Sequence, residues 1–169
     1  TTDFWDSYLD HYITEPDIRW LAEEGANVVR LPFDYRLLTH DDFLGRDIQG
    51  YAYLDRAIEW CGKYGIYVLL DMHAAPGGQT GDNIDDSDGY PWLMVDTGMQ
   101  HEVCDLWKDI ARRYASNSAV IGYNLLNEPI PHYFADDSLK PYLEPLYRRI
   151  TAAIREVDPY HIVFLGGAV

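Results

Sequence analysis

The apolar positions of the chain fall into two alternating patterns. Four nearly unbroken apolar runs are typical of strands that are covered on both faces, and they occupy residues 27–33, 66–72, 119–126 and 161–165. Elsewhere, apolar residues recur at spacings of three and four, which predicts helices around residues 18–22, 54–61, 103–114 and 143–157. The predicted order is therefore one helix, three strand–helix units and a final strand.

Local signals mark the ends of the predicted helices. Thr14 and Asp17 have the spacing of a capping box at the start of the first helix, and Gly25 is placed to end that helix. Asp158 and Pro159 end the last helix, because proline cannot continue a helix and disfavours helical geometry in the residue before it. These signals agree with the apolar periodicity.

The alternation of strands and helices predicts an α/β fold with a parallel sheet and right-handed crossovers. The long insertions follow strands rather than helices, at residues 36–53, 74–99 and 130–140. That asymmetry is typical of (β/α)8 barrels and of doubly wound sheets, whose functional sites lie at the carboxyl ends of the strands. No glycine-rich nucleotide-binding motif follows an early strand, which favours the barrel.

About four parallel strands make only part of a (β/α)8 TIM barrel. At this strand spacing, eight strands would need roughly twice the length of the chain, beyond the ~250 residues of a typical barrel. We therefore expect residues 1–169 to form a single domain that is the N-terminal portion of a longer barrel. An unpaired edge strand of such a partial sheet is an aggregation hazard unless another segment covers it.

Composition narrows the class of partner. The net charge of −15 disfavours nucleic acid, anionic membranes and polyanionic substrates, so a neutral substrate fits best. No apolar stretch is long enough for a transmembrane helix, and no signal peptide is visible at the start of the sequence. The 14 tyrosines and 5 tryptophans permit sugar stacking without requiring it. Cys61 and Cys104 lack partners at metal-binding spacings and are predicted to be buried free thiols.

Polar side chains gather where the predicted strands end. Arg30 lies near the end of the first strand, Asp71 and His73 at the end of the second, and Asn127 and Glu128 at the end of the third. Asp71 and His73 share one face of their strand, so the carboxylate can set the tautomer of the imidazole. Each residue alone also has a structural interpretation, such as a buried ion pair for Arg30 if its face points inward. Their convergence favours an active site.

Three motifs at these strand ends resemble glycoside hydrolase family 5, the cellulase family. They are VVRLPF (28–33), LDMHAAPG (70–77) and GYNLLNEP (122–129), and the segment HAAPGGQ (73–79) is most similar to exo-glucanase-like branches. The resemblance covers roughly residues 14–166 and implies a retaining glycosidase on a (β/α)8 barrel, with no cofactor and no metal. It would make Glu128 the acid/base, place Asn127 at the sugar 2-hydroxyl and His73 beside the scissile bond, and let Arg30 brace the nucleophile.

The implied reaction needs a second carboxylate. In a retaining glycosidase one carboxyl group protonates the leaving oxygen, and a second one, about 5–5.5 Å away, attacks the anomeric carbon. A partly desolvated glutamate suits the first role. In this family the second carboxylate lies on the seventh strand, whereas this sequence stops after what would be the fifth, and Asp34 and Asp71 do not match the nucleophile position. We therefore expect the chain alone to lack normal hydrolase activity and to need the remainder of the barrel.

The resemblance also implies a β-glucan or related β-glycan as substrate and a secreted or periplasmic location, since polymeric glycans lie outside the cell. The main alternative is a non-catalytic carbohydrate-binding or pseudoenzyme fragment. A metal-dependent barrel hydrolase is disfavoured because His73 lacks a second histidine at a ligand-like spacing. The acidic segment 82–89 fails the EF-hand pattern and fits a solvated loop better. Tyr35 and Trp92 are candidate sugar-binding residues, with loop packing as the alternative for each.

Overall fold

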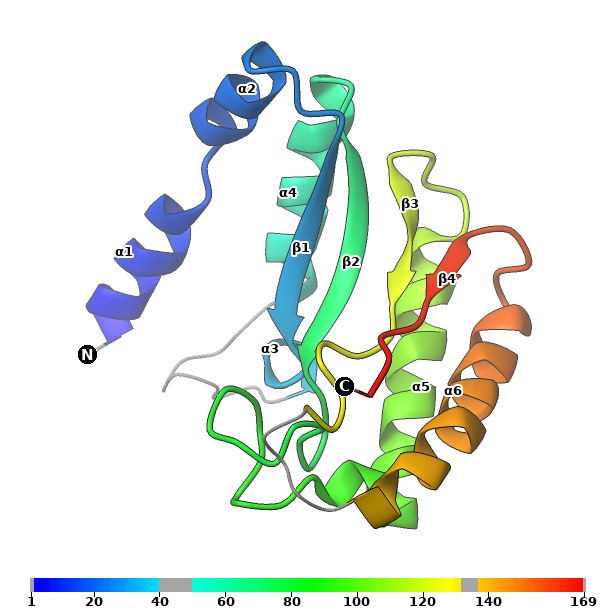
Figure 1. Ribbon diagram of the computed structural model, residues 1–169. Helices are drawn as coiled ribbons and strands as arrows, with labels where there is room; N and C mark the ends of the chain where they lie inside the picture. Colours follow the sequence, from blue (N-terminus) through cyan, green and yellow to red (C-terminus); the bar gives the residue numbers. More distant parts are fainter. Residues whose placement is uncertain (1, 40–49, 132–136, 169) are drawn as a thin grey trace. The chain divides into compact units, whose positions relative to one another are not determined.

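The computed structural model describes residues 2–39, 50–131 and 137–168 (Figure 1). Its strands form one sheet in the order β1-β2-β3-β4, and β3 pairs with β4 in parallel. The strands are β1 (Val28–Asp34), β2 (Tyr67–Ala74), β3 (Val120–Asn124) and β4 (Ile162–Phe164). The α-helices are α1 (Thr2–Tyr12), α2 (Glu15–Glu23), α3 (Arg36–Thr39), α4 (Gly50–Lys63), α5 (Thr97–Tyr114) and α6 (Lys140–Arg155), and the short 3-10 helices are η2 (Trp92–Met94) and η3 (Asp137–Leu139). This alternation confirms the predicted α/β class.

The short helices α3, η2 and η3 lie within the predicted insertions, and the observed elements differ from the predicted ones at two further places. Helix α1 was not predicted, although Phe4, Tyr8 and Tyr12 lie four residues apart, and in the structure these side chains are exposed. Strand β3 ends at Asn124, two residues before the end of the apolar run. The chain then leaves the extended conformation, and Glu128 adopts a φ of +42°.

The chain divides into two compact units, each built from separate segments. The first comprises Thr1–Leu31, Arg36–Leu69 and Ser118–Ile121, and the second comprises Pro32–Tyr35, Leu70–Asn117 and Gly122–Val169. The carboxyl ends of β1, β2 and β3 therefore belong to the second unit, together with β4, α5 and α6. The single domain expected from the sequence stays a prediction.

The start of α2 in the first unit follows the predicted capping box. The Asp17 carboxylate accepts hydrogen bonds from the main-chain nitrogen of Thr14 at 2.9 Å and from its hydroxyl at 2.6 Å. At the other end of α2, Gly25 has a φ of +89°, a left-handed conformation that glycine adopts without steric cost. Both predicted boundaries of this helix are confirmed.

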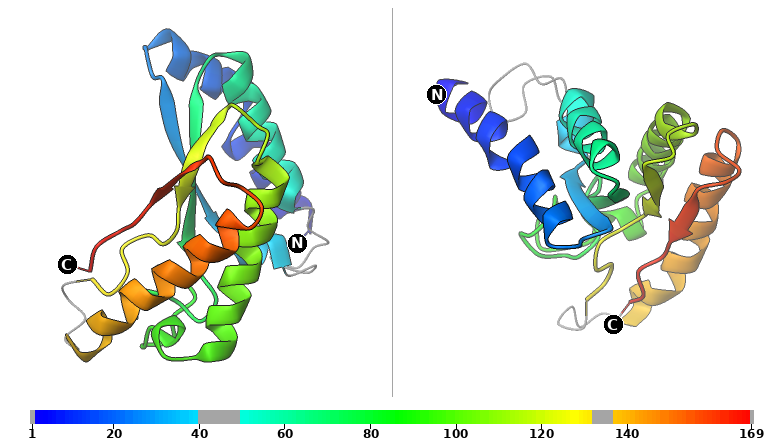
Figure 2. Two further views of the ribbon diagram at one scale, coloured as in Figure 1. Left: turned by 90° about the vertical axis from the view of Figure 1, so that its right-hand side faces the viewer. Right: turned by 90° about the horizontal axis from the view of Figure 1, so that it is seen from above.

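The core of the second unit forms around Trp107 of α5. Its side chain is fully buried, and its ring packs against Phe33 and Tyr123, with centroids 6.0 and 5.6 Å away. The indole nitrogen donates to the carbonyl oxygen of Leu125 at 3.1 Å. Helices α5 and α6 pack side by side over β3 and β4 (Figure 1, Figure 2). Trp107 thus fixes the chain just before Asn127.

Strand β4 forms one edge of the sheet and pairs closely with β3. Gly122 is opposite Ile162, and a Cβ at Gly122 would lie 2.2 Å from the carbonyl oxygen of Ile162, so only glycine fits. Beyond this pairing, Ile162, Phe164 and Leu165 remain between 36% and 56% exposed. Among the described residues, this edge therefore presents apolar surface that no other element covers.

A buried network ties β3 to the loop before β4. The hydroxyl of Tyr123 donates to Asp158 Oδ2 at 2.6 Å, and Nδ1 of His161 lies 2.6 Å from the same oxygen. Burial alone would raise the pKa of Asp158, but hydrogen bonds from Tyr123, from the main chain of His161 and Tyr160 and from the His161 ring hold that pKa below its ordinary value. Burial, together with the nearby carboxylate, raises the pKa of Tyr123.

Candidate active site

The end of β2 carries a hydrogen-bonded group around Asp71. One oxygen of the fully buried Asp71 carboxylate lies 2.7 Å from Nδ1 of His73, and the other accepts from the side-chain amide of Asn124 at 2.5 Å. The predicted pairing of Asp71 with His73 is therefore present. The sequence reasoning missed Asn124, although a polar residue inside the apolar run of β3 was a signal. An ionised carboxylate can only accept, so it favours a proton on Nδ1 and leaves Nε2 of a neutral His73 as an acceptor.

Beyond β3, the next segment carries Asn127 and Glu128. The main-chain nitrogen of Asn127 donates to the carbonyl oxygen of Met72 at 3.1 Å, which joins this segment to β2. Asn127 is buried, whereas Glu128 is exposed. The partial desolvation expected for Glu128 is thus absent from the described chain, because nothing in its described residues covers this position.

The backbone that carries Glu128 has an uncommon conformation. Glu128 and Ile130 are the only described residues other than glycine with positive φ, at +42° and +51°. Such conformations cost of order 1–3 kcal/mol each and persist only when the surrounding contacts enforce them. Backbone strain of this kind is concentrated at functional sites, which makes the segment around Pro129 a candidate site.

Gln79 holds the ends of β2 and β3 together, a contact that the sequence did not predict. Its side chain is fully buried, and Nε2 donates to the carbonyl oxygens of His73 at 2.8 Å and Asn127 at 3.0 Å. The main-chain carbonyl oxygen of Gln79 accepts a hydrogen bond from the main-chain nitrogen of Ile130 at 3.0 Å. Gln79 lies in the HAAPGGQ segment, but no local pattern shows that its partners include a residue 48 positions away.

Arg30 belongs to the first unit, on β1. Its side chain is exposed, as are the neighbouring Val28 and Pro32 on the same face of the strand. The inward, buried setting considered for this face is therefore not observed, because the described residues leave the face open. A role for Arg30 beside a nucleophile stays a prediction.

The two aromatic candidates differ in exposure. Tyr35 is only 7% exposed, and its hydroxyl donates to Asp86 at 2.8 Å, which favours the loop-packing interpretation over sugar stacking. Trp92, at the start of η2, is 48% exposed and lies 4.8 Å from Tyr90 between ring centroids. Trp92 thus keeps an accessible ring face and remains a candidate sugar contact.

The acidic segment 82–89 is only partly the solvated loop that we expected, because one of its carboxylates is buried and hydrogen-bonded. Asp85 is buried, and its carboxylate accepts from the main-chain nitrogens of Gln79, Thr80 and Ser87, each at 2.8 Å. Asp82 and Asp88 are exposed. Within the described ranges there is no cluster of three or more His, Cys, Asp and Glu residues that could hold a metal, and no helix long and apolar enough to cross a membrane.

Both cysteines are free, as predicted, but only Cys61 is fully buried. Burial raises the pKa of the Cys61 thiol to about 11 and also raises that of Cys104, which is half-buried. Neither thiol is therefore a reactive nucleophile at neutral pH.

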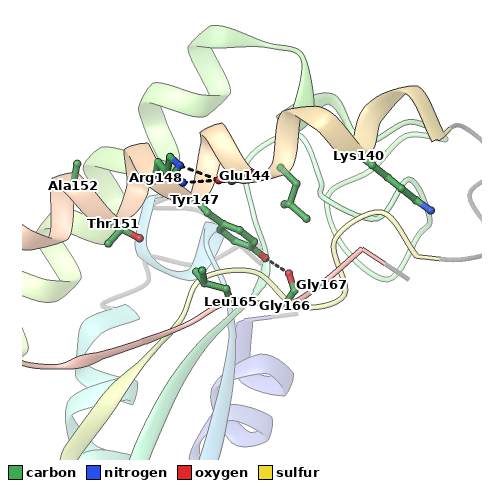
Figure 3. A pocket seen from close by; sticks show the side chains of 10 residues that line it. Lys140, Glu144, Tyr147, Arg148, Thr151, Ala152, Leu165, Gly166 and Gly167 are labelled. Carbon is green, nitrogen blue, oxygen red and sulfur yellow. Dashed lines mark hydrogen bonds and ion pairs between the residues drawn. The ribbon is translucent and has the colours of Figure 1, made fainter.

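A groove of about 770 Å³ runs along α6 beside the residues that follow β4 (Figure 3). Tyr147 of α6 lies in its wall and donates a hydrogen bond to the carbonyl oxygen of Gly166 at 2.8 Å. Gly166 is also close to the candidate segment, since a Cβ there would lie 3.2 Å from Cδ of Pro129. The groove thus borders the segment that carries Glu128. Its lining residues are Lys140, Leu143, Glu144, Tyr147, Arg148, Thr151, Ala152, Leu165, Gly166 and Gly167.

Comparison with known proteins matches this chain to one family along nearly its whole length. The family model described as Cellulase (glycosyl hydrolase family 5) matches residues 2–169. The chain is 39% identical over 169 residues to a beta-xylosidase of Phanerodontia chrysosporium, and 36% identical over 165 residues to endoglucanase C of Acetivibrio thermocellus. Each alignment covers 97% of this chain, but only 34% of the xylosidase and 45% of the endoglucanase. The chain therefore spans less than half the length of these relatives.

The fold comparison agrees with the sequence comparison. A solved structure described as a glycoside hydrolase is 28% identical and superimposes with a TM-score of 0.73, covering 91% of this chain and 46% of that one. The four-stranded sheet thus corresponds to part of a (β/α)8 barrel, as predicted. The resemblance stated from the three motifs is confirmed.

Proposed function

Because the chain belongs to glycosyl hydrolase family 5, the cellulase family, we propose that it carries the acid/base half of a retaining β-glycan hydrolase site. The observation that carries this proposal is the geometry of the segment after β3. An exposed carboxylate, Glu128, is held on a strained backbone. The same segment is hydrogen-bonded to the strand end that presents the Asp71–His73 pair.

In the proposed reaction, Glu128 protonates the glycosidic oxygen as the bond to the anomeric carbon breaks. A second carboxylate forms the glycosyl–enzyme bond, and the ionised Glu128 then takes a proton from the water that hydrolyses it. His73 presents Nε2 beside the scissile bond, in a tautomer favoured by Asp71. Asn127 binds the sugar 2-hydroxyl, and Arg30 and Trp92 contribute to substrate binding.

The nucleophilic carboxylate is proposed to come from the remainder of the barrel. The chain spans 34–45% of its named relatives, and the exposed edge of β4 with the adjoining groove offers surface against which further strand–helix units would pack. On this proposal the 169-residue chain alone does not hydrolyse glycosides. The relatives named beta-xylosidase and endoglucanase support a β-linked glycan as substrate, and such a substrate favours secretion.

The test compares two aryl β-glycosides in the completed barrel, with Glu128 replaced by alanine. A dinitrophenolate leaves without help, whereas an unsubstituted phenolate needs a proton. We expect Glu128→Ala to lower kcat/KM for the phenyl glycoside by about 100-fold or more and to affect the dinitrophenyl glycoside far less. The exposed Glu102 of α5 supplies the matched control, Glu102→Ala, which should leave both substrates unaffected.

Two results would overturn the proposal. Undiminished hydrolysis of the phenyl glycoside by Glu128→Ala would remove Glu128 from the acid role. A completed wild-type barrel that binds β-glycans but turns over neither substrate would instead favour the non-catalytic carbohydrate-binding alternative.

A further inference from the structure

Both hydrogens and the oxygen of the Gln79 side-chain amide make hydrogen bonds. Nε2 has two hydrogens, and it donates one to the carbonyl oxygen of His73 at 2.8 Å and one to that of Asn127 at 3.0 Å. Oε1 accepts from the main-chain nitrogen of Ala75 at 3.1 Å. The side chain is fully buried, so water does not replace these bonds. Each of them satisfies a main-chain group at the end of β2 or just beyond β3.

The main chain of Gln79 holds the same segment from its other side. Its carbonyl oxygen accepts from the nitrogen of Ile130 at 3.0 Å. Gln79 therefore binds Asn127 through its side chain and Ile130 through its main chain, on the two sides of Glu128 and Pro129. Because Pro129 has no N–H to donate, the segment is held by the main-chain bonds on either side of it, from Gln79 and from the Asn127 nitrogen to Met72.

The contacts enclose the strained part of the backbone. Glu128 and Ile130 have φ values of +42° and +51°, and a branched residue such as isoleucine rarely adopts such a value. Without hydrogen bonds from neighbouring residues, the backbone of this segment would relax toward ordinary φ values, and the Glu128 side chain would then point in another direction. The bonds from Gln79 oppose that relaxation.

The loop that presents Gln79 is itself closely packed. Gly77 and Gly78 have φ values of +70° and +72°, and a Cβ at Gly78 would lie 1.9 Å from the hydroxyl of Ser87. The buried Asp85 carboxylate accepts from the nitrogen of Gln79 at 2.8 Å. The position of the Gln79 backbone is therefore set by the packing of Gly78 against Ser87 and by the hydrogen bond to Asp85.

We propose that Gln79 is a positioning residue for the acid/base: it does not touch substrate, but it fixes the backbone of residues 127–130 and thereby the direction of the Glu128 carboxylate. The inference rests on the proposed function, since it assigns a task to the contacts around Glu128. Glutamine suits this task because it supplies two donors and one acceptor. A glutamate would direct a carboxylate at two carbonyl oxygens, and a methionine would remove all three hydrogen bonds that the glutamine side chain makes.

The test is the ratio of kcat/KM between a phenyl and a dinitrophenyl β-glycoside, measured on the completed barrel. The ratio is taken on one sample, so it does not depend on how much of the protein is folded. Gln79→Met should lower the ratio by about tenfold, because a misplaced acid mainly slows the reaction that needs its proton. Gln79→Glu keeps the length of the side chain and its acceptor oxygen, and it should also lower this ratio. This variant replaces Gln79→Met in the test if the methionine variant does not fold.

A matched control is available in Gln100, another buried glutamine. Its Nε2 donates to the carbonyl oxygens of Leu93 and Met94 at 3.0 and 2.9 Å, and its Oε1 accepts from Arg149 at 2.6 Å. Gln100→Met loses the same kinds of bond away from Glu128 and should leave the ratio unchanged. A ratio unchanged in both Gln79 variants, or changed equally in Gln100→Met, would overturn the positioning role.

Glu128→Ala separates this inference from the proposed function. If Glu128→Ala lowers the ratio but the Gln79 variants do not, the acid assignment stands and the positioning role fails. If Glu128→Ala itself leaves the ratio unchanged, the proposed function fails, and the positioning role fails with it.

Discussion

The buried Asp71 carboxylate lies 2.7 Å from Nδ1 of His73, and its second oxygen is occupied by Asn124. Because an ionised carboxylate cannot donate, this contact favours the His73 tautomer protonated on Nδ1. In Asp71→Asn, the amide can present its NH2 group to Nδ1, so we expect the population to shift toward the tautomer protonated on Nε2. The ¹⁵N chemical shifts of the His73 ring measure this directly. Identical shifts in the wild type and Asp71→Asn would contradict the prediction, and the exposed Asp88→Asn serves as control.

Because β3 and β4 approach closely at Gly122, we expect a side chain at this position to destabilise the fold. In Gly122→Ala the new Cβ would lie 2.2 Å from the carbonyl oxygen of Ile162, so the two strands must separate. We expect the free energy of unfolding to fall by about 1–3 kcal/mol, as for an overpacked core. Gly167→Ala is the control, because no atom lies within 4 Å of its added Cβ. Urea unfolding that shows equal effects of the two substitutions would contradict the observed pairing.

The network of Tyr123 and Asp158 predicts a pH-dependent loss of stability. The pKa of Asp158 is lower in the folded chain than its ordinary value of about 3.9. Its ionised form therefore stabilises the fold above about pH 4, and this contribution is lost as the pH falls through the folded pKa. Tyr123→Phe removes one hydrogen bond to this carboxylate, which we expect to cost about 1.5–3 kcal/mol at neutral pH.

The loss of unfolding free energy caused by Tyr123→Phe should become smaller below about pH 4, because protonated Asp158 no longer offers a charged acceptor. Urea unfolding of the wild type and the variant between neutral and acidic pH measures the difference. Tyr160→Phe is the control, since that side chain is 87% exposed. A cost for Tyr123→Phe that stays constant across this pH range would contradict the assigned role of Asp158.

Local patterns in the sequence were sufficient for the strands and for the helices that cover them. The apolar run at 119–126 located β3, and the spacing of Val103, Trp107 and Ile110 located α5, because burial on one face enforces that periodicity. The pairing of Asp71 with His73 followed from the alternation of side chains along a strand. Each of these features depends on neighbours in the sequence.

The features that were missed depend on residues far apart in the chain. Gln79 has a partner 48 positions away, and Asp71 is bonded to Asn124 at a separation of 53. The exposure of Glu128 also could not be read from its apolar approach, because burial depends on which segments cover the strand end. Sequence motifs located the strand ends, but the long-range hydrogen bonds between them could be identified only in the structure.

The most direct test of the acid/base assignment is chemical rescue of Glu128→Ala in the completed barrel. With a dinitrophenyl β-glycoside, azide can attack the anomeric carbon of the glycosyl–enzyme without general-base help. A carbon–nitrogen bond forms as the bond to the nucleophilic carboxylate breaks. We expect azide to raise the turnover rate of Glu128→Ala but not that of the wild type, and the product to be the β-glycosyl azide, identified by its anomeric proton coupling. No rate gain and no azide adduct, or an adduct of the α configuration, would contradict the acid/base assignment.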